Sequence, residues 1–306
     1  MRNLRPQTAL GGQSASHSAR ISVMRFYKWA VPALVMLLVS VGCQDIKHQT
    51  TSHRPKALRS VVSLSPNTSE LAIMTLQVSL VGRGESDNFP ANVKSYPVVM
   101  NGVHPDYEAI AKSNADGVLY DNQTISPADI AKLNQMKLVT IGVGGTSYDA
   151  YKKSLYEAAA LLRAESSVND YIQGQIDRNI AQAKAIIGTK KTTVAVIMPG
   201  TGTEHMIAGA NSFIADLLRH IGATPMGPDA DKYVKLNAED FIKENPDVIL
   251  VVGAPDSFAS DPRFASMPAV KDKRLAGLDP DIALREGSRV DQLVQDMGNA
   301  IVKVRP

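Results

Sequence analysis

Cysteine is almost absent from this chain of 306 residues, which contains a single one, Cys43. One thiol cannot form an intramolecular disulfide, so the stability of the fold must come from its hydrophobic core. Aromatic residues are also scarce at 5% of the sequence, and Trp29 is the sole tryptophan. Few flat side chains are therefore available for stacking.

Motifs of common enzymes are missing as well. The sequence has no Gly-x-Ser-x-Gly and no Walker loop. Gly200-Thr-Gly202 imitates a dinucleotide-binding turn, but His205 occupies the position of the third glycine. We expect no enzymatic activity. The enzyme that stays open as an alternative is a secreted α/β hydrolase-type enzyme or a deaminase that uses His205 with an acid.

An export signal stands near the start of the chain. Arg25 and Lys28 precede an apolar run, residues 29–41, and small residues lead to Cys43. This run is shorter than the roughly 20 residues that span a bilayer as a helix, so we expect cleavage. The terminal thiol resembles a bacterial lipoprotein signal, which implies that Cys43 is lipidated and anchors an extracytoplasmic protein to the membrane. We interpret residues 1–43 as an N-terminal extension and signal, with Met24 as an alternative start.

The charge balance changes once this segment is removed. Residues 1–43 hold five basic residues and no acids, which leaves 28 Lys and Arg against 30 Asp and Glu. The mature chain is therefore slightly acidic, and the sequence pI of 8.8 is no argument for nucleic acid as a partner.

The rest of the chain alternates between strand and helix patterns. Residues 44–57 are polar and predict a flexible tether. Residues 58–147 predict a first α/β lobe with strands at 61–64, 79–82, 117–120 and 137–143 and helices from Ser65, near 106–113 and near 126–135. Residues 188–306 predict a second α/β lobe with strands at 193–198, 247–252 and 275–278 and helices at 211–221 and 288–304.

Residues 148–187 separate these lobes, and they contain no proline and a single glycine, Gly174. Apolar residues recur at near-helical spacing, which predicts one long linker helix or two abutting ones. The fold class is therefore α/β, with two lobes joined by a helix.

Several motifs carry a family resemblance. They run from Arg59-Ser-Val-Val-Ser-Leu-Ser-Pro-Asn-Thr-Ser-Glu-Leu71 through Leu80-Val-Gly-Arg83 and Tyr107-Glu-Ala-Ile110 to Asn245-Pro-Asp-Val-Ile249 and Leu284-Arg-Glu-Gly-Ser-Arg289. In order and spacing they resemble the periplasmic binding proteins for cobalamin, haem and ferric siderophores. The resemblance implies two Rossmann-like lobes bridged by one long α-helix, with the ligand in the cleft between the lobes.

It also implies a function. A protein of this kind captures a metal chelate and delivers it to the permease of an ABC importer, and it needs no cofactor. We expect a monomer with a ferric siderophore as its ligand, and cobalamin or haem as further possibilities. Large flat macrocycles usually bind by stacking on aromatic side chains, so the low aromatic content argues against cobalamin and haem.

Residues at the carboxyl ends of predicted strands are the candidate ligand contacts, because ligands of open α/β sheets bind there. Arg83 and Arg285 suit an anionic chelate, although Arg83 fits equally well as a surface residue bonded to loop carbonyls. Tyrosines offer a flat face and a hydroxyl. The predicted ligand-binding residues are Ser65, Asn67, Arg83, Tyr120, Tyr148, His205 and Arg285.

Two further roles follow from residue type and motif position. His104 and His205 could hold a bare zinc or manganese ion together with a carboxylate such as Glu70, Asp121 or Asp256, although they lack local ligand spacing. The resemblance implies that each lobe presents an acid to the importer. We assign these docking roles to Glu108 and, in the second lobe, to Asp216, because Arg219 stands at the motif position.

Overall fold

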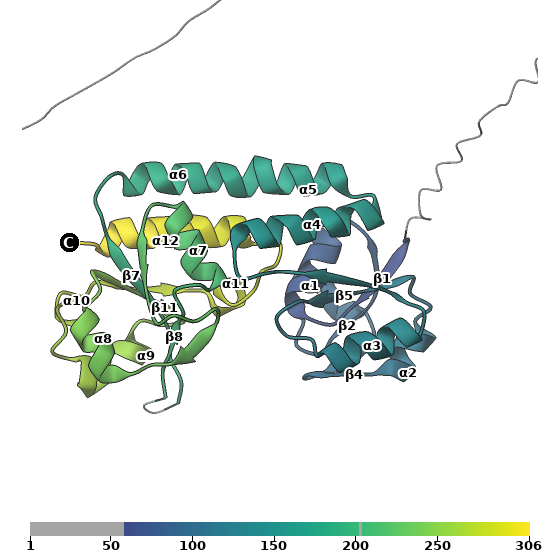
Figure 1. Cartoon of the computed structure of the whole chain (residues 1–306), viewed down its shortest axis with the longest axis horizontal. Helices are drawn as coiled ribbons and strands as arrows, with labels where there is room; N and C mark the ends of the chain where they lie inside the picture. Colours follow the sequence, from purple (N-terminus) through teal and green to yellow (C-terminus); the bar gives the residue numbers. More distant parts are fainter. Residues whose placement is uncertain (1–57, 202–203) are drawn as a thin grey trace, which may run out of the picture. The chain divides into compact units, whose positions relative to one another are not determined.

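The computed structural model describes residues 58–201 and 204–306, which form two α/β lobes and a bridging helix (Figure 1). The predictions for the signal, for the tether and for lipidation of Cys43 lie outside the described residues. In the part of the chain that is described, no helix combines the length and apolar character that a membrane span requires.

The first lobe is built on a six-stranded sheet with the order β4-β3-β2-β1-β5-β6. All neighbouring strands are parallel except β4, which is antiparallel to β3. Its strands are β1 (Ser60–Ser63), β2 (Ser79–Gly84), β3 (Val98–Asn101), β4 (His104–Pro105), β5 (Gly117–Asp121) and β6 (Val139–Val143). Its helices are α1 (Pro66–Glu70), which continues as a π-helical turn η1 (Leu71–Thr75), the 3₁₀ turn η2 (Ala91–Ser95), α2 (Tyr107–Lys112) and α3 (Pro127–Gln135).

Local chemistry explains where these helices begin. The side chain of Asp106 accepts a hydrogen bond from Ala109 N and starts α2, and Ser126 does the same for α3. Proline occupies the first turn of α1 and α3, where its fixed φ suits a helix and no partner for an N–H is needed.

The second lobe is built on a second sheet with the order β10-β8-β7-β11-β12, and β9 also pairs with β7. Its strands are β7 (Thr193–Met198), β8 (Met206–Ala208), β9 (Thr224–Met226), β10 (Tyr233–Lys235), β11 (Val248–Val252) and β12 (Leu275–Leu278). Its helices are α7 (Phe213–His220), α8 (Ala238–Glu244), α9 (Asp256–Ala259), η4 (Pro262–Phe264), α10 (Pro268–Lys271), α11 (Pro280–Ala283) and α12 (Val290–Val304). Strand β11 is buried along its whole length, as its unbroken β-branched and leucine sequence indicates.

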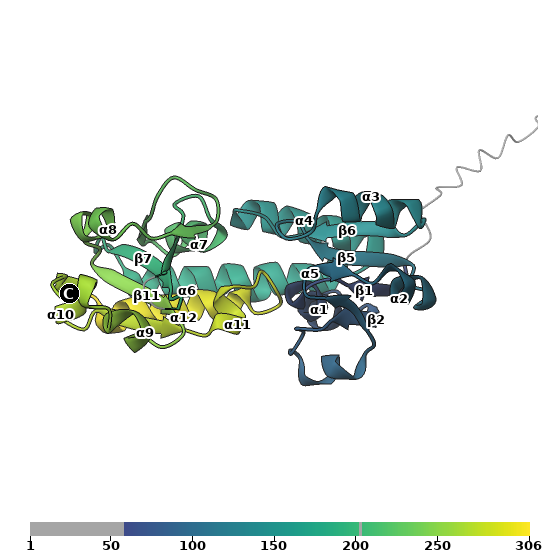
Figure 2. The same cartoon turned by 90° about the horizontal axis from the view of Figure 1, so that it is seen from below.

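Residues 148–187 form two helical stretches, not one continuous helix. The first is α4 (Tyr148–Leu162), which ends at Arg163 in the left-handed conformation with φ of 56°. The second is a continuous rod of α5 (Glu165–Tyr171), the π-helical turn η3 (Ile172–Asp177) and α6 (Arg178–Ile187). Figures 1 and 2 show α4 doubling back onto this rod, which passes both lobes. The bridge of the fold is therefore 165–187, and α4 packs on β6 of the first sheet.

The bridge packs tightly on the closing helix α12. A methyl group at Gly298 would lie 2.8 Å from Cβ of Ala183, so only glycine allows this approach of α12 to α6. One hydrophobic cluster joins the bridge, α4, α7, α12 and one face of both sheets. Side chains alternate across the sheets, as Val61 belongs to this cluster and Val62 to a separate cluster on the far face. The two lobes therefore share this cluster, and each lobe also has a cluster of its own.

Candidate ligand site between the lobes

Residues of both lobes line a cavity of about 360 Å³, which we call the main cavity. Its first-lobe wall comes from the segments that follow β1, β2, β3 and β5, at the carboxyl edge of the sheet where ligands of α/β proteins bind. The second lobe contributes α11 and the residues after it. The lining residues are Leu64, Ser65, Pro66, Asn67, Gly84, Ser86, Met100, Gly102, Val103, Asp121, Thr124, Pro280, Asp281, Leu284 and Arg285.

A second, smaller cavity of about 190 Å³ lies beside it, and we call it the side cavity. Asp121, Thr124, Leu284 and Arg285 line both cavities. The other lining residues of the side cavity are Gln123, Ser212, Phe213, Ile214, Asp231, Lys232, Tyr233, Ala283 and Glu286. The two cavities thus form adjoining parts of one interlobe site.

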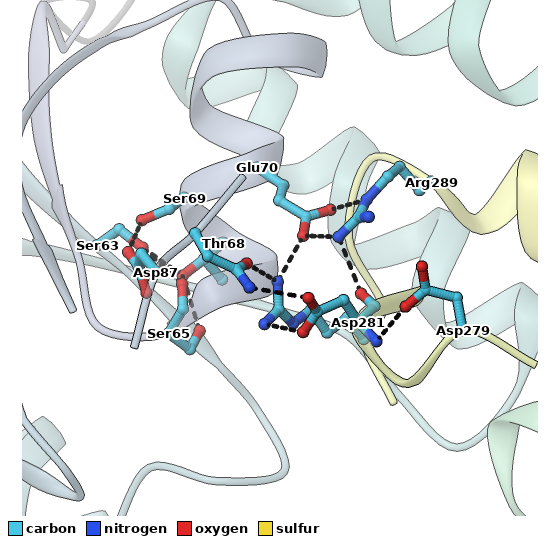
Figure 3. Close-up of polar contacts among 11 residues, drawn as sticks. Ser63, Ser65, Thr68, Ser69, Glu70, Asp87, Asp279, Asp281 and Arg289 are labelled. Atoms are coloured by element: carbon cyan, nitrogen blue, oxygen red, sulfur yellow. Dashed lines mark hydrogen bonds and ion pairs between the residues drawn. The ribbon is translucent and has the colours of Figure 1, made fainter. Parts of the chain in front are cut away.

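The start of α1 supplies a wall of hydroxyl and amide groups. Thr68 Oγ1 lies 2.7 Å from Ser63 Oγ and 2.8 Å from Ser65 Oγ, and this buried cluster is visible in Figure 3. Asn67 Nδ2 donates to Asp121 Oδ2 over 2.9 Å. These bonds fix the side chains at the carboxyl ends of β1 and β5, so the wall is pre-organised.

A buried ion cluster joins the lobes behind the main cavity. The Glu70 side chain on α1 is 1% exposed, and its carboxylate accepts from Arg289 Nη2 at 2.6 Å and from Arg285 Nη1 at 3.1 Å. Arg289 Nε makes a further bond of 3.1 Å (Figure 3). A carboxylate held by two guanidinium groups across two lobes fixes how the lobes face each other.

The same arginines are bound by further groups. Arg285 Nη2 donates to Asp281 Oδ1 over 2.7 Å, and Arg285 Nη1 donates to Asn88 Oδ1 over 2.7 Å. The guanidinium of Arg289 also covers the Phe89 ring, 4.2 Å from its centroid. Arg285 therefore lines both cavities while its charge is neutralised by protein carboxylates.

Glu286 is the buried acid of the side cavity. Its Oε2 accepts from Gly145 N over 2.8 Å, and its Oε1 accepts from Gln123 Nε2. Burial raises the pKa of Glu286 to about 8, and the charge of nearby Asp121 adds to this effect. Burial also raises the pKa of Asp121. The side cavity therefore contains two acids whose charged forms are disfavoured.

The predicted ligand contacts divide into two groups. Ser65, Asn67 and Arg285 line the main cavity. Arg83 instead donates to the carbonyls of Tyr96, Gly84 and Glu85, which is the loop-bonded arrangement considered above. Tyr120 is half-buried and packs against the far-face cluster of the first lobe. Its neighbour Asp121 lines the cavities in its place.

Tyr148 and Asp216 lie together where α4 meets α7. Tyr148 is 1% exposed, its hydroxyl donates to Asp177 Oδ1 over 2.9 Å, and it lines neither cavity. Asp216 accepts from the backbone N–H of Tyr148 over 2.8 Å, and His220 and Arg219 stand at 3.5 and 3.8 Å. Asp216 thus holds the start of α4, whereas Glu108 is exposed on α2 and pairs with Lys112 at 2.6 Å.

The two histidines stand apart. His104 is exposed on the edge strand β4 of the first lobe. His205 is buried in the second lobe, with its Nε2 3.1 Å from Asp261 Oδ2 and its ring against Phe258 and Phe264. A hydrogen bond and charge from Arg263 hold the pKa of Asp261 well below its usual range. Among the residues described, no group of three or more His, Cys, Asp and Glu side chains is placed to hold a metal ion.

Sequence reasoning did not select Glu286 or Tyr233 for the site, and it gave Arg289 no role. Glu286 and Arg289 belong to a motif that carries the family resemblance, so the sequence contained a signal that could have pointed to them as site residues. Tyr233 follows no glycine-rich turn and stands in a short strand that the sequence pattern did not reveal.

Two α/β lobes around an interlobe cavity, joined by a helix, are typical of a solute-binding protein. The sequence model of the periplasmic binding protein family matches residues 61–282, and the chain belongs to this family. It is an ABC transporter substrate-binding protein, and the expectation that it is not an enzyme is confirmed. The hydrolase alternative is not supported.

Individual relatives agree with this assignment. The chain is 24% identical over 270 residues to the uncharacterized ABC transporter substrate-binding lipoprotein YvrC of Bacillus subtilis, covering 85% of each chain. It is 22% identical over 239 residues to the high-affinity heme uptake system protein IsdE of Staphylococcus aureus strain Newman, covering 74% of this chain and 77% of that one. The periplasmic vitamin B12 binding protein BtuF of Vibrio cholerae has the same fold, with a TM-score of 0.68, 15% identity and coverage of 82% and 99%.

Proposed function

We propose that this protein captures a metal chelate in the interlobe cavities outside the cytoplasm and delivers it to the permease of an ABC importer. The observation that carries the proposal is the main cavity, whose walls come from both lobes and present hydroxyl, amide and carboxyl groups. A polar, two-sided cavity of this size suits a compact solute that both lobes hold. The names of IsdE, a heme uptake system protein, and of BtuF, a vitamin B12 binding protein, support a chelate as the ligand class.

The lining favours a compact ferric chelate over a tetrapyrrole. Among the described residues that line the main cavity there is no aromatic ring, and Phe213 and Tyr233 are the rings of the side cavity. A flat macrocycle gains much of its binding energy from stacking. A siderophore-type ferric complex instead presents polar groups at its periphery, which Ser65, Asn67 and Ser86 can bond.

A binding panel tests this proposal. The protein, extracted in detergent, is titrated calorimetrically with a ferric trihydroxamate, a ferric triscatecholate, haem and cobalamin. We expect one-to-one binding of a ferric chelate at micromolar or lower Kd, and at least tenfold weaker binding of both tetrapyrroles. If only haem or cobalamin bound tightly, the ligand would be a tetrapyrrole and not a ferric chelate. Binding of none of the four would contradict the proposal.

Delivery requires contact with the permease and proximity to the membrane. We infer that Glu108 is the first-lobe docking acid, because it is exposed and its ion pair with Lys112 is a weak surface pair. Asp216 already accepts a hydrogen bond from the backbone N–H of Tyr148 at the start of α4. Its docking role stays a prediction from its position in the motif. Lipidation at Cys43 would tether a monomer near the importer.

A further inference from the structure

We propose that the side cavity is a recognition subsite for a positively charged, N–H-donating group of the ligand, such as a primary ammonium. Asp121, Glu286 and Tyr233 would supply the acceptor oxygens. This inference rests on the proposed function, because it names the chemistry that one part of the same site selects.

The two carboxyl groups come from different lobes and converge. Asp121 ends β5 of the first lobe, and Glu286 follows α11 of the second. A methyl group built on Gly144 would lie 3.5 Å from Asp121 Oδ1 and 2.9 Å from Glu286 Oε2. The first distance is ordinary contact and the second is too short, so Glu286 Oε2 needs the missing side chain of Gly144, whose φ of 101° also favours glycine. Both carboxyl groups therefore approach the same point beside the cavity.

Neither carboxyl group has a cationic partner among the residues that the structure describes. Asp121 accepts from Asn67 Nδ2 at 2.9 Å and from the backbone N–H of Gln123 at 2.7 Å. Glu286 accepts only from amide donors, Gly145 N and Gln123 Nε2. Buried carboxylates without a counter-charge are costly, and proteins usually pair them. A cationic ligand group would supply the missing counter-charge.

Tyr233 is an independent sign that something binds here. It lines the side cavity from β10, and its hydroxyl oxygen is buried without a hydrogen-bond partner among the described residues. Burial raises the pKa of its phenol, so the hydroxyl stays neutral and can accept or donate. Native proteins rarely leave a buried hydroxyl unpaired, which points to a ligand group as its partner.

The remaining charges near the side cavity do not cancel this preference. Arg285 is neutralised by Glu70 and Asp281. Lys232 and Asp231 are exposed neighbours of opposite sign on the rim. Because the two cavities share four lining residues, the body of a chelate can occupy the main cavity while a pendant ammonium reaches the side cavity.

The preference should depend on pH. Burial raises the pKa of Glu286 to about 8, so near pH 6.5 the group holds a proton that must leave to solvent when an ammonium binds. Each pH unit below the pKa then weakens binding by up to about tenfold. We expect the ammonium-bearing ligand to bind roughly 25 times more tightly at pH 8.5 than at pH 6.5.

A matched pair of ligands tests the inference. The probes are a ferric linear trihydroxamate that ends in a primary ammonium and the same chelate with that nitrogen acetylated. Calorimetry at pH 8 with the full-length protein in detergent should show at least tenfold tighter binding of the ammonium chelate. Glu286→Gln and Asp121→Asn should each remove most of this preference, and Glu157→Gln, an exposed acid on α4, should leave it unchanged within twofold.

Tyr233→Phe removes a single oxygen atom and preserves the packing. We expect it to reduce the preference for the ammonium chelate about threefold, the effect of losing one hydrogen bond. Equal binding of the two chelates to the unaltered protein would overturn the inference and leave the proposed function standing. Binding of neither chelate would also overturn the inference, and the proposed function would then be decided by the other three ligands of the binding panel.

Discussion

Replacing Glu70 by Gln removes the negative charge that holds two arginines at the junction of the lobes. The Glu70 side chain is 1% exposed, and those of Arg285 and Arg289 are 14% and 15% exposed. Gln keeps the shape and one acceptor oxygen, but its NH₂ group would oppose the second guanidinium. The variant therefore leaves two nearly buried positive charges without their common partner.

The magnitude follows from this burial. Removing one partner of a buried ion pair costs about 3–5 kcal/mol, because the remaining charge stays desolvated. Asp281 still neutralises part of the charge on Arg285, so we expect a loss of about 3 kcal/mol in the free energy of unfolding. With a urea m-value near 3 kcal/mol/M for a chain of this size, the midpoint should fall by about 1 M.

Equilibrium urea unfolding, followed by far-ultraviolet circular dichroism, measures this shift. The control is Glu108→Gln, which breaks an exposed i,i+4 pair and should change the free energy of unfolding by less than about 0.5 kcal/mol. The double variant Glu70→Gln/Arg289→Met should lose less than the sum of the single variants, because no guanidinium at 289 is then left unpaired. A loss below about 1 kcal/mol for Glu70→Gln would refute the role of the cluster.

Three further predictions concern pH, the bridge and the anchor. Since the pKa of Glu286 rises from 4.5 to about 8 on folding, the unfolding free energy should fall as pH rises through that window, by at most about 5 kcal/mol; Glu286→Gln should flatten this slope in urea titrations, and an unchanged slope would contradict the assignment. The rod from Glu165 to Ile187 should limit lobe closure to a small rotation, so X-ray scattering should show nearly the same radius of gyration with and without ligand, and a large compaction would place a hinge at its ends. Cys43→Ala should move the chain from the detergent phase to the aqueous phase in phase partitioning, whereas unchanged partitioning would indicate another anchor.

Local signals made much of the fold predictable. The predicted helix near 106–113 is observed at Tyr107–Lys112, because Asp106 caps its start. The apolar stripe of the closing helix is buried as its 3.6-residue spacing indicates. The break between α4 and α5 was not predictable in the same way, because Leu162-Arg163-Ala164-Glu165 contains neither glycine nor proline and its left-handed residue is an arginine.

The site was less predictable because its contacts join distant parts of the chain. Glu70 and Arg285 are 215 residues apart in sequence, and no local pattern predicts that their side chains meet. The type of a residue also does not tell whether its side chain points into the cavity. Tyrosine and histidine were reasonable ligand contacts, yet Tyr148 bonds Asp177 at the helix junction and His205 packs in the aromatic core of the second lobe.

The central claim is that this protein carries a metal chelate, and the visible absorption spectrum of protein purified from its native host, combined with metal analysis, tests it most directly. We predict about one equivalent of iron and a broad charge-transfer band typical of a ferric chelate. Extraction of the ligand should remove the colour and the iron together. A colourless protein without bound metal, which also takes up none of the chelates in the binding panel, would contradict the claim.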